Sequence, residues 1–149
     1  MPTRLSRSER DAFLSDVRVG VLSVASNDPD RAPVSAPIWY TYSPETGISV
    51  MMNRTSRKGV AIDAAKRFSL VVQSESLPYR YVTVEGPVVE IRGTEGITDV
   101  LPLAIRYLGE EQGTAYAKGW YEAGAAETDF VYTMKPTKWN TADFTNDLG

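Results

Sequence analysis

The chain has 149 residues, of which 42% are hydrophobic, and a formal net charge of −3 at pH 7. This length fits one domain that buries roughly two thirds of the surface exposed by its unfolded chain, so we predict a single domain over residues 1–149. The acidic balance argues against general nucleic-acid binding, which favours a basic face. The sequence shows no signal-peptide pattern and no apolar run long enough to span a bilayer. We therefore expect a cytoplasmic protein with neither nucleic-acid nor membrane partners.

The absence of two residue types narrows the possible chemistry. The sequence contains no Cys and no His. It therefore offers no thiolate nucleophile, no Ser-His-Asp triad and none of the usual zinc or haem ligands, and we predict no metal site. An enzyme of this composition would depend on a bound cofactor for its chemistry, since the protein then supplies only binding and orientation.

The first predicted elements are a helix and a series of short strands. A capping box, Ser6 followed by Glu9, starts a helix within residues 5–17. The strand over residues 34–42 contains Pro37, which cannot donate a ladder hydrogen bond, so this strand should lie at a sheet edge or contain a bulge. The other predicted strands cover residues 19–25, 48–52, 68–75, 81–92 and 129–134, with a last one within residues 135–143.

Helical patterns interrupt these strands twice. A short helix begins near Ser56, and two further helices cover residues 94–108 and 113–121, where Pro102 should start a new segment or kink the first of them. Many short strands with few helices favour a mainly β, α+β fold: a small antiparallel barrel of about six to seven strands with attached helices.

The turn between residues 48–52 and the helix that follows is the strongest candidate for a functional site. Ser56 is followed by Arg57 and Lys58, and Arg54 lies close by. Cations in the first turn of a helix are unfavourable because the positive end of the helix dipole repels them, and the free N–H groups there favour an anion. One bound phosphate would resolve both problems. Alternatively, these long side chains simply extend into water at an ordinary exposed helix start, and the residues alone leave both interpretations open.

Several other polar and aromatic side chains are candidates for ligand contact. Trp39 is favoured because it follows Pro37 on the irregular strand, whereas Trp120 is better explained by the core or a subunit interface. Gln73 is the polar residue near the end of an apolar strand, where it either closes the strand or reaches a ligand's polar edge. No side chain is an obvious catalytic proton donor, although Tyr79, Tyr81 or solvent could serve.

Four segments resemble a known family when taken in order. They read A-P-V-S-A-P-I-W-Y, S-V-M-M-N-R-T-S-R-K-G, F-S-L-V-V-Q and Y-V-T-V-E-G-P-V-V. This order resembles the pyridoxamine 5′-phosphate oxidase-like flavin or deazaflavin reductases, over about residues 6–92 and more loosely over residues 129–143. The resemblance implies a split β-barrel that forms a homodimer, with two cofactor sites at the subunit interface.

The resemblance also implies roles for particular residues. One segment would bind the phosphate of FMN or of coenzyme F-420, a second would lie along the cofactor ring, and the C-terminal segment would reach across from the other subunit. The implied cofactor-binding residues are Asn53, Ser56, Arg57 and Lys58 for the phosphate, Ala36, Pro37, Ile38, Trp39 and Gln73 for the ring, and Trp139 from the other subunit. The candidates for substrate binding are Tyr79 and Tyr81.

The C-terminal segment bears on the choice of substrate. True pyridoxamine phosphate oxidases carry an Arg- and His-containing motif there, whereas this chain has K-W-N-T-A-D-F, so we do not expect pyridoxamine phosphate as the substrate. L-S-R-S-E-R-D-A-F-L and R-V-G-V-L-S-V are similar to short actinobacterial members assigned to F-420. The resemblance thus implies an F-420-dependent reductase that passes hydride to a small unsaturated or conjugated substrate. The alternatives are an FMN-dependent oxidoreductase or oxidase, and a non-catalytic protein that binds a cofactor or another ligand.

Overall fold

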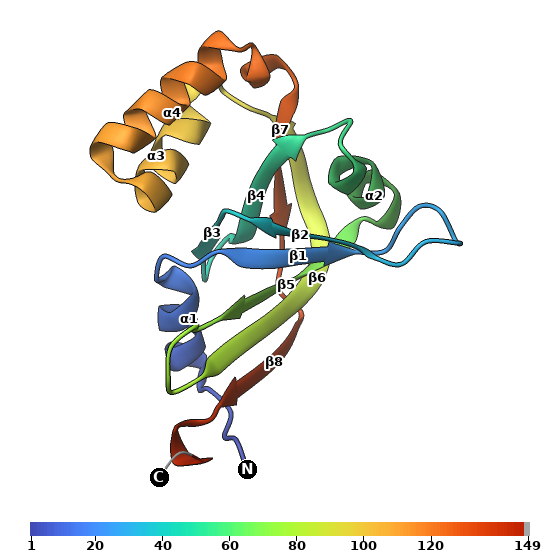
Figure 1. The fold of residues 1–149 in the computed structure, drawn as a ribbon. Coiled ribbons are helices and arrows are strands. Elements are labelled where there is room, and N and C mark those ends of the chain that lie inside the picture. Colours follow the sequence, from blue (N-terminus) through green and yellow to red (C-terminus); the bar gives the residue numbers. More distant parts are fainter. Residues whose placement is uncertain (148–149) are drawn as a thin grey trace.

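The computed structural model describes residues 1–147 and shows an eight-stranded antiparallel sheet that curls into a half-barrel with helices attached (Figure 1). The strands are β1 Gly20–Val24, β2 Val34–Ile38, β3 Tyr40–Ser43, β4 Gly47–Asn53, β5 Arg67–Gln73, β6 Arg80–Gly93, β7 Asp129–Met134 and β8 Lys138–Asp143. The helices are α1 Arg7–Ser15, α2 Arg57–Ala65, α3 Ile97–Leu108 and α4 Glu110–Glu122, with short 3-10 helices at Ala125–Glu127 and Thr145–Asp147. None of these helices is both long and apolar enough to cross a bilayer.

The long strand β6 holds the two halves of the sheet together. The strand order is β2-β1-β5-β6-β7-β4-β3, with β8 also paired to β6. The first half of β6 pairs with β5 and β8, and its second half pairs with β7. The change from β8 to β7 falls between Glu85 and Val88. Within this stretch a side chain on Gly86 would collide with the backbone oxygen of Lys135, so only glycine fits. Beyond this point the pairing with β7 is irregular, with a register shift between Val88 and Glu90.

The core fills the space inside the curled sheet. Buried residues alternate along the strands, and the pattern is clearest in β5, where Phe68, Leu70 and Val72 point inward. Phe13 from α1 and Ile62 from α2 join the same apolar cluster. These two helices therefore cover the interior of the half-barrel, and α2 is fixed in place at the end of β4.

The mainly β, α+β architecture agrees with the sequence prediction, while two details differ. The predicted strand over residues 34–42 is divided at Trp39 into β2 and β3, and β2 is an outer strand, as Pro37 indicated. Pro102 does not start a new segment, because α3 runs from Ile97 to Leu108 through it. Pro102 is the sixth of the 12 residues of α3, and its missing N–H removes one intrahelical bond, to the carbonyl of Thr98.

Candidate cofactor site

The turn that joins β4 to α2 is tightly hydrogen-bonded. Asn53 Oδ1 accepts from the backbone N–H of Thr55 at 2.8 Å and from its hydroxyl at 2.7 Å. Ser56 caps the helix: its Oγ donates to the backbone oxygen of Asn53 at 2.6 Å and accepts from the N–H of Gly59 at 3.2 Å. A Cβ on Gly59 would lie 2.6 Å from the backbone oxygen of Arg54, so this close turn requires glycine. Asn53 and Ser56 thus fix the backbone of the predicted phosphate segment.

The three cations of this segment have different surroundings. Arg54 Nε lies 3.0 Å from Asp63 Oδ2, and the Arg54 guanidinium lies 4.7 Å from the centre of the Phe130 ring. This carboxylate raises the pKa of Arg54. Arg57 and Lys58 form no ion pair with any residue between 1 and 147, and the first turn of α2 contains no acidic residue. The uncompensated positive charge is therefore that of Arg57 and Lys58.

Backbone donors lie beside these two cations. The N–H groups of Arg57 and Lys58 have no hydrogen-bond acceptor within the described part of the chain. Two free N–H groups and two flexible cations at a helix start form a donor set suited to a phosphate oxyanion. The residues present therefore fit the phosphate of FMN or of F-420.

The predicted ring segment and Gln73 lie at the same end of the sheet. Gly20 of β1 aligns with Ile38 of β2 on one side and with Val72 of β5 on the other. Ile38 and Val72 are thus two strand spacings apart, about 10 Å. Gln73 follows Val72 and is exposed. A ligand lying along residues 36–39 could therefore be reached from β5.

A cavity of about 290 Å³ lies between the ring segment and the hairpin formed by α3 and α4. Its lining residues are Val19, Pro37, Ile38, Trp39, Met51, Val100, Leu103, Tyr116, Trp120 and Asp129. Asp129 is the cross-strand neighbour of Asn53, the first residue of the phosphate segment. The cavity therefore connects the ring segment with the base of the basic turn.

The side chain of Trp39 is held by the hairpin. Its ring stacks on Tyr107 of α3, with the centroids 5.0 Å apart and the planes at 4°, and lies 5.3 Å from the ring of Tyr116 of α4. The hydroxyl of Tyr107 accepts from the N–H of Tyr40 at 3.1 Å and donates to the backbone oxygen of Arg18 at 2.7 Å. Trp39 is thus part of a fixed aromatic group, which we did not identify from the sequence because Tyr107 has no local motif.

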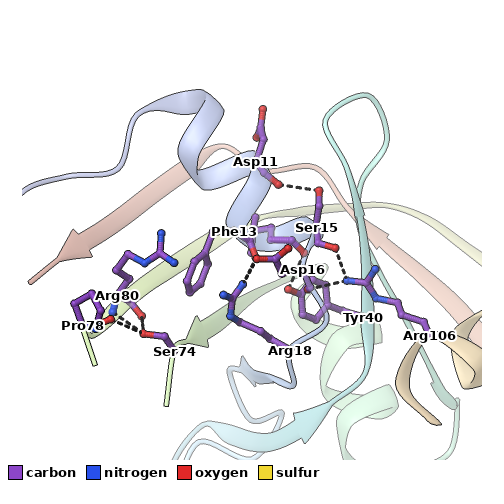
Figure 2. A network of polar contacts seen from close by, with 11 residues as sticks. Asp11, Phe13, Ser15, Asp16, Arg18, Tyr40, Ser74, Pro78, Arg80 and Arg106 are labelled. Carbon is purple, nitrogen blue, oxygen red and sulfur yellow. Dashed lines mark hydrogen bonds and ion pairs between the residues drawn. The ribbon is translucent and has the colours of Figure 1, made fainter. Parts of the chain in front are cut away.

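The hairpin is also attached to the end of α1. Arg106 of α3 donates from Nη2 to the backbone oxygens of Ser15 at 3.1 Å and Asp16 at 2.9 Å, as Figure 2 shows. In the same network Arg18 donates to the oxygen of Phe13 at 2.6 Å and lies over its ring at 3.8 Å. Cations at the C-terminal end of a helix are favourable, so these contacts stabilise both α1 and the position of the hairpin.

A larger groove adjoins the cavity on the outer face of β3, β4, β7 and the second half of β6. It has a volume of about 530 Å³ and shares Met51 and Leu103 with the smaller cavity. Arg92 and Asp99 form an ion pair in its wall, with Nη2 and Oδ1 2.8 Å apart. Hydrogen bonding to Arg92 lowers the pKa of the Asp99 carboxyl.

The remaining predicted site residues lie elsewhere in the chain. Trp139 packs beneath the guanidinium of Arg10 at 3.9 Å and edge-on to Tyr42 at 6.4 Å, so it contacts its own chain. Tyr79 and Tyr81 line an open hollow of about 400 Å³ at the β5–β6 turn, together with Gln73 and Arg80. Gln73 therefore connects this hollow with the ring segment, while the reach of Trp139 into a partner's site stays a prediction.

Comparisons with known proteins are informative at the level of structure. No family model matches the sequence, and no curated protein matches it. A protein described as an F-420 reductase superposes with a TM-score of 0.68 at 19% identity, over 87% of this chain and 94% of that chain. An FAD-binding protein from Mesorhizobium loti superposes with a TM-score of 0.64 at 17% identity, over 96% of each chain. A putative pyridoxamine 5′-phosphate oxidase from Listeria innocua superposes with a TM-score of 0.60 at 14% identity, over 90% of this chain and 94% of that chain.

These likenesses define the class of fold. Proteins named for F-420, for FAD and for pyridoxamine 5′-phosphate oxidase superpose on 87%, 96% and 90% of this chain. The protein therefore has the split β-barrel fold, and the resemblance seen in the sequence is confirmed at this level. Because fold does not fix function, cofactor and substrate have to be argued from the site.

Proposed function

We propose that this protein is a deazaflavin (coenzyme F-420)-dependent reductase that passes hydride to a small unsaturated or conjugated substrate. One observation carries the proposal: the basic turn at the start of α2 lies next to a cavity bounded by Pro37, Ile38 and Trp39. A ligand whose phosphate lies at the turn and whose ring system lies along the backbone of residues 36–39, beside the cavity, matches this arrangement. The likeness to a protein described as an F-420 reductase supports the choice of cofactor.

Each part of the site has a separate role in this proposal. Arg57 and Lys58, with their backbone N–H groups, bind the phosphate, while Asn53 and Ser56 hold the turn in its binding conformation. The backbone from Ala36 to Trp39 orients the ring, and Gln73 reaches its polar edge. The bound cofactor would supply the hydride, and the chain supplies position and an environment shielded from water. Substrate contact by Tyr79 and Tyr81 stays a prediction, because the hollow that they line is linked to the ring segment only through Gln73.

The second candidate is an FMN-dependent oxidoreductase that uses the same turn. The donor set of Arg57 and Lys58 serves either phosphate, so it does not discriminate between the cofactors. F-420 also carries an acidic tail that needs nearby cations. Arg54 is bound to Asp63, and Arg80 lies over Phe13 at 5.2 Å, which leaves Arg57, Lys58 and the exposed Arg31 for the tail.

A parallel titration of the purified protein with F-420 and with FMN, followed by cofactor fluorescence, tests the proposal. We expect tight binding of F-420 and weak binding of FMN. The reverse result would select the flavin enzyme, with oxygen as a candidate acceptor. If neither cofactor bound, both proposals would be rejected, and a solvated helix start would explain the basic turn. Tight binding without turnover in a substrate screen would select a non-catalytic binding protein.

We further propose that the protein is a homodimer with the cofactor sites at its interface, as the sequence resemblance implies. In that arrangement Trp139 of the partner subunit completes each site. The mass in solution, measured by light scattering with and without F-420, tests this proposal. A monomer at all concentrations would contradict it.

A further inference from the structure

The cavity under the α3–α4 hairpin has the composition of a small-molecule site. Its volume of about 290 Å³ is close to the lower end of the range for ligand pockets. Trp39, Tyr116 and Trp120 contribute aromatic surface, and Val100 and Leu103 contribute aliphatic surface from α3. An apolar pocket with aromatic walls favours a flat, conjugated occupant, because the rings can stack with its faces.

One carboxylate gives the cavity a polar end. Asp129 is the only charged residue in its lining, and the side chain is half-buried. Its Oδ2 accepts a hydrogen bond from Trp120 Nε1 at 2.9 Å. Among residues 1–147, Oδ1 has no hydrogen-bond donor and no cation pairs with this carboxylate. A partly desolvated carboxylate with an open acceptor atom favours an N–H or O–H donor, or a cation, and disfavours an anion.

The walls of the cavity are held in place by contacts outside it. Trp39 is stacked on Tyr107, whose hydroxyl is bound to the backbone of Arg18 and Tyr40. α3 and α4 pack closely because Gly113 has no side chain: a Cβ there would lie 2.6 Å from the Cα of Ile105. The pocket is therefore preformed, and a ligand would not have to order it.

We propose that this cavity binds a planar conjugated molecule that is neutral with a hydrogen-bond donor, or cationic, and that this molecule is the hydride acceptor. Pro37, Ile38 and Trp39 form one wall, so the occupant lies next to the segment proposed to orient the cofactor ring. Asp129 fixes the donor or cationic end, and Trp120 orients the carboxylate. The claim that the cavity binds a ligand depends only on the structure of the cavity, whereas the claim that this ligand accepts hydride rests on the proposed function.

The test is calorimetric titration of the cofactor-free protein with 1-naphthylmethylamine, which is a cation at pH 7, and with the anionic 1-naphthoate. We expect the amine to bind at least about tenfold more tightly, as a hydrogen bond to a charged group predicts. Asp129→Asn should remove most of this preference. Equal binding of the two compounds by the wild-type protein, or an unchanged preference in Asp129→Asn, would overturn the proposal.

A pair of blocking variants locates the bound compound without using Asp129. Leu103 lines both the cavity and the larger groove, whereas Val89, which is 57% exposed, lines the groove alone. Leu103→Trp should abolish amine binding, and Val89→Trp should leave it within about twofold, the range of an ordinary surface substitution. Thermal unfolding of both variants confirms that they fold. Loss of binding in Val89→Trp with retention in Leu103→Trp would assign the compound to the groove and reject the cavity.

A competition measurement separates this inference from the proposed function. Binding of the amine together with F-420 supports an acceptor site beside the cofactor. Displacement of F-420 by the amine would show that the cavity holds the cofactor ring and would overturn the acceptor assignment. Amine binding with no binding of F-420 would reject the proposed function, and with it the acceptor role, while the ligand site would remain.

Discussion

Helices α1 and α2 begin in closely similar ways and differ in how their first turns are completed. Each is 9 residues long and is capped by a serine, Ser6 or Ser56, that accepts the N–H of the third helical residue. In α1 that third residue is Glu9, whose carboxylate accepts the N–H of Ser6 at 2.9 Å, and this bond lowers the pKa of Glu9. In α2 the third residue is Gly59, and the first turn contains no acidic residue.

The comparison shows which feature of α2 points to a ligand. Both helices start with an arginine and leave N–H groups without an acceptor in the described residues, so neither feature is sufficient alone. Only α1 supplies its own carboxylate at the positive end of the dipole. At the second and third helical positions, where α1 has Ser8 and Glu9, α2 has a second cation, Lys58, and an obligatory glycine, Gly59. The α2 start therefore lacks an anion that α1 carries within its own sequence.

Removing both cations of α2 should have the largest effect on cofactor binding. Arg57→Ala/Lys58→Ala deletes two charge-assisted contacts and should weaken F-420 or FMN binding by about 100-fold or more, measured by fluorescence titration. The melting temperature should change little because neither side chain has a partner among residues 1–147.

The matched control for this variant is Lys118→Ala/Lys138→Ala, which makes the same change in net charge at exposed positions on α4 and β8. The control should leave cofactor binding within about 0.5 kcal/mol of wild type. Equal losses in the two double variants would show that general electrostatics, and not a local site, attracts the cofactor.

Substituting the glycine that closes the α2 turn should destabilise the protein. Gly59→Ala places a Cβ 2.6 Å from the oxygen of Arg54 and 2.7 Å from that of Asn53, so the backbone has to move, at a cost of about 2 kcal/mol. Cofactor affinity should fall as well, because the phosphate segment shifts. Gly119→Ala, in open space on α4, should instead stabilise the protein by about 0.5–1 kcal/mol. Urea unfolding measures the change in unfolding free energy of both variants. An unchanged unfolding free energy in Gly59→Ala would contradict the close contact in the turn.

Removing either helix cap should lower the stability of the protein by a similar amount, but only one of the two changes should affect cofactor binding. Ser56→Ala and Ser6→Ala each remove an N-cap bond and should each cost about 1 kcal/mol in free energy of unfolding. Only Ser56→Ala should also weaken F-420 binding, because Ser56 holds the turn that presents Arg57 and Lys58. A matching loss of affinity in Ser6→Ala would indicate that the effect comes from lower stability and not from the site.

The smallest expected effect concerns pH and the start of α3, where Asp99 supplies an acid in the first turn. Arg92 lowers the pKa of Asp99, so the stabilisation is present above the unfolded pKa of about 3.9 and is lost as the pH falls through the lower folded value. The difference in unfolding free energy between wild type and Asp99→Asn should therefore shrink below about pH 4. We expect the part of this difference that depends on pH to be less than about 1 kcal/mol, since the Arg92 side chain is 37% exposed. A difference that grows in acid would contradict this assignment.

Local patterns predicted the elements well because they depend on neighbouring residues. The cap at Ser56 and the outer position of the Pro37 strand both follow from local preferences of a single residue type. The split of that strand at Trp39 was missed because residues 34–42 have a continuous strand pattern, and the break is made by contacts with the hairpin. The binding roles of Asn53 and Lys58 stay predictions.

The sequence by itself determined a mainly β fold and a basic turn with an open helix start, since both are encoded within a few consecutive residues. Only the tertiary structure decided that Asp129 lies beside Asn53 and that the hairpin covers Trp39. Tyr40 and Tyr107 are hydrogen-bonded although 67 residues separate them. Such contacts depend on how β6 bends and how α3 and α4 pack against the sheet, and no local periodicity carries that information.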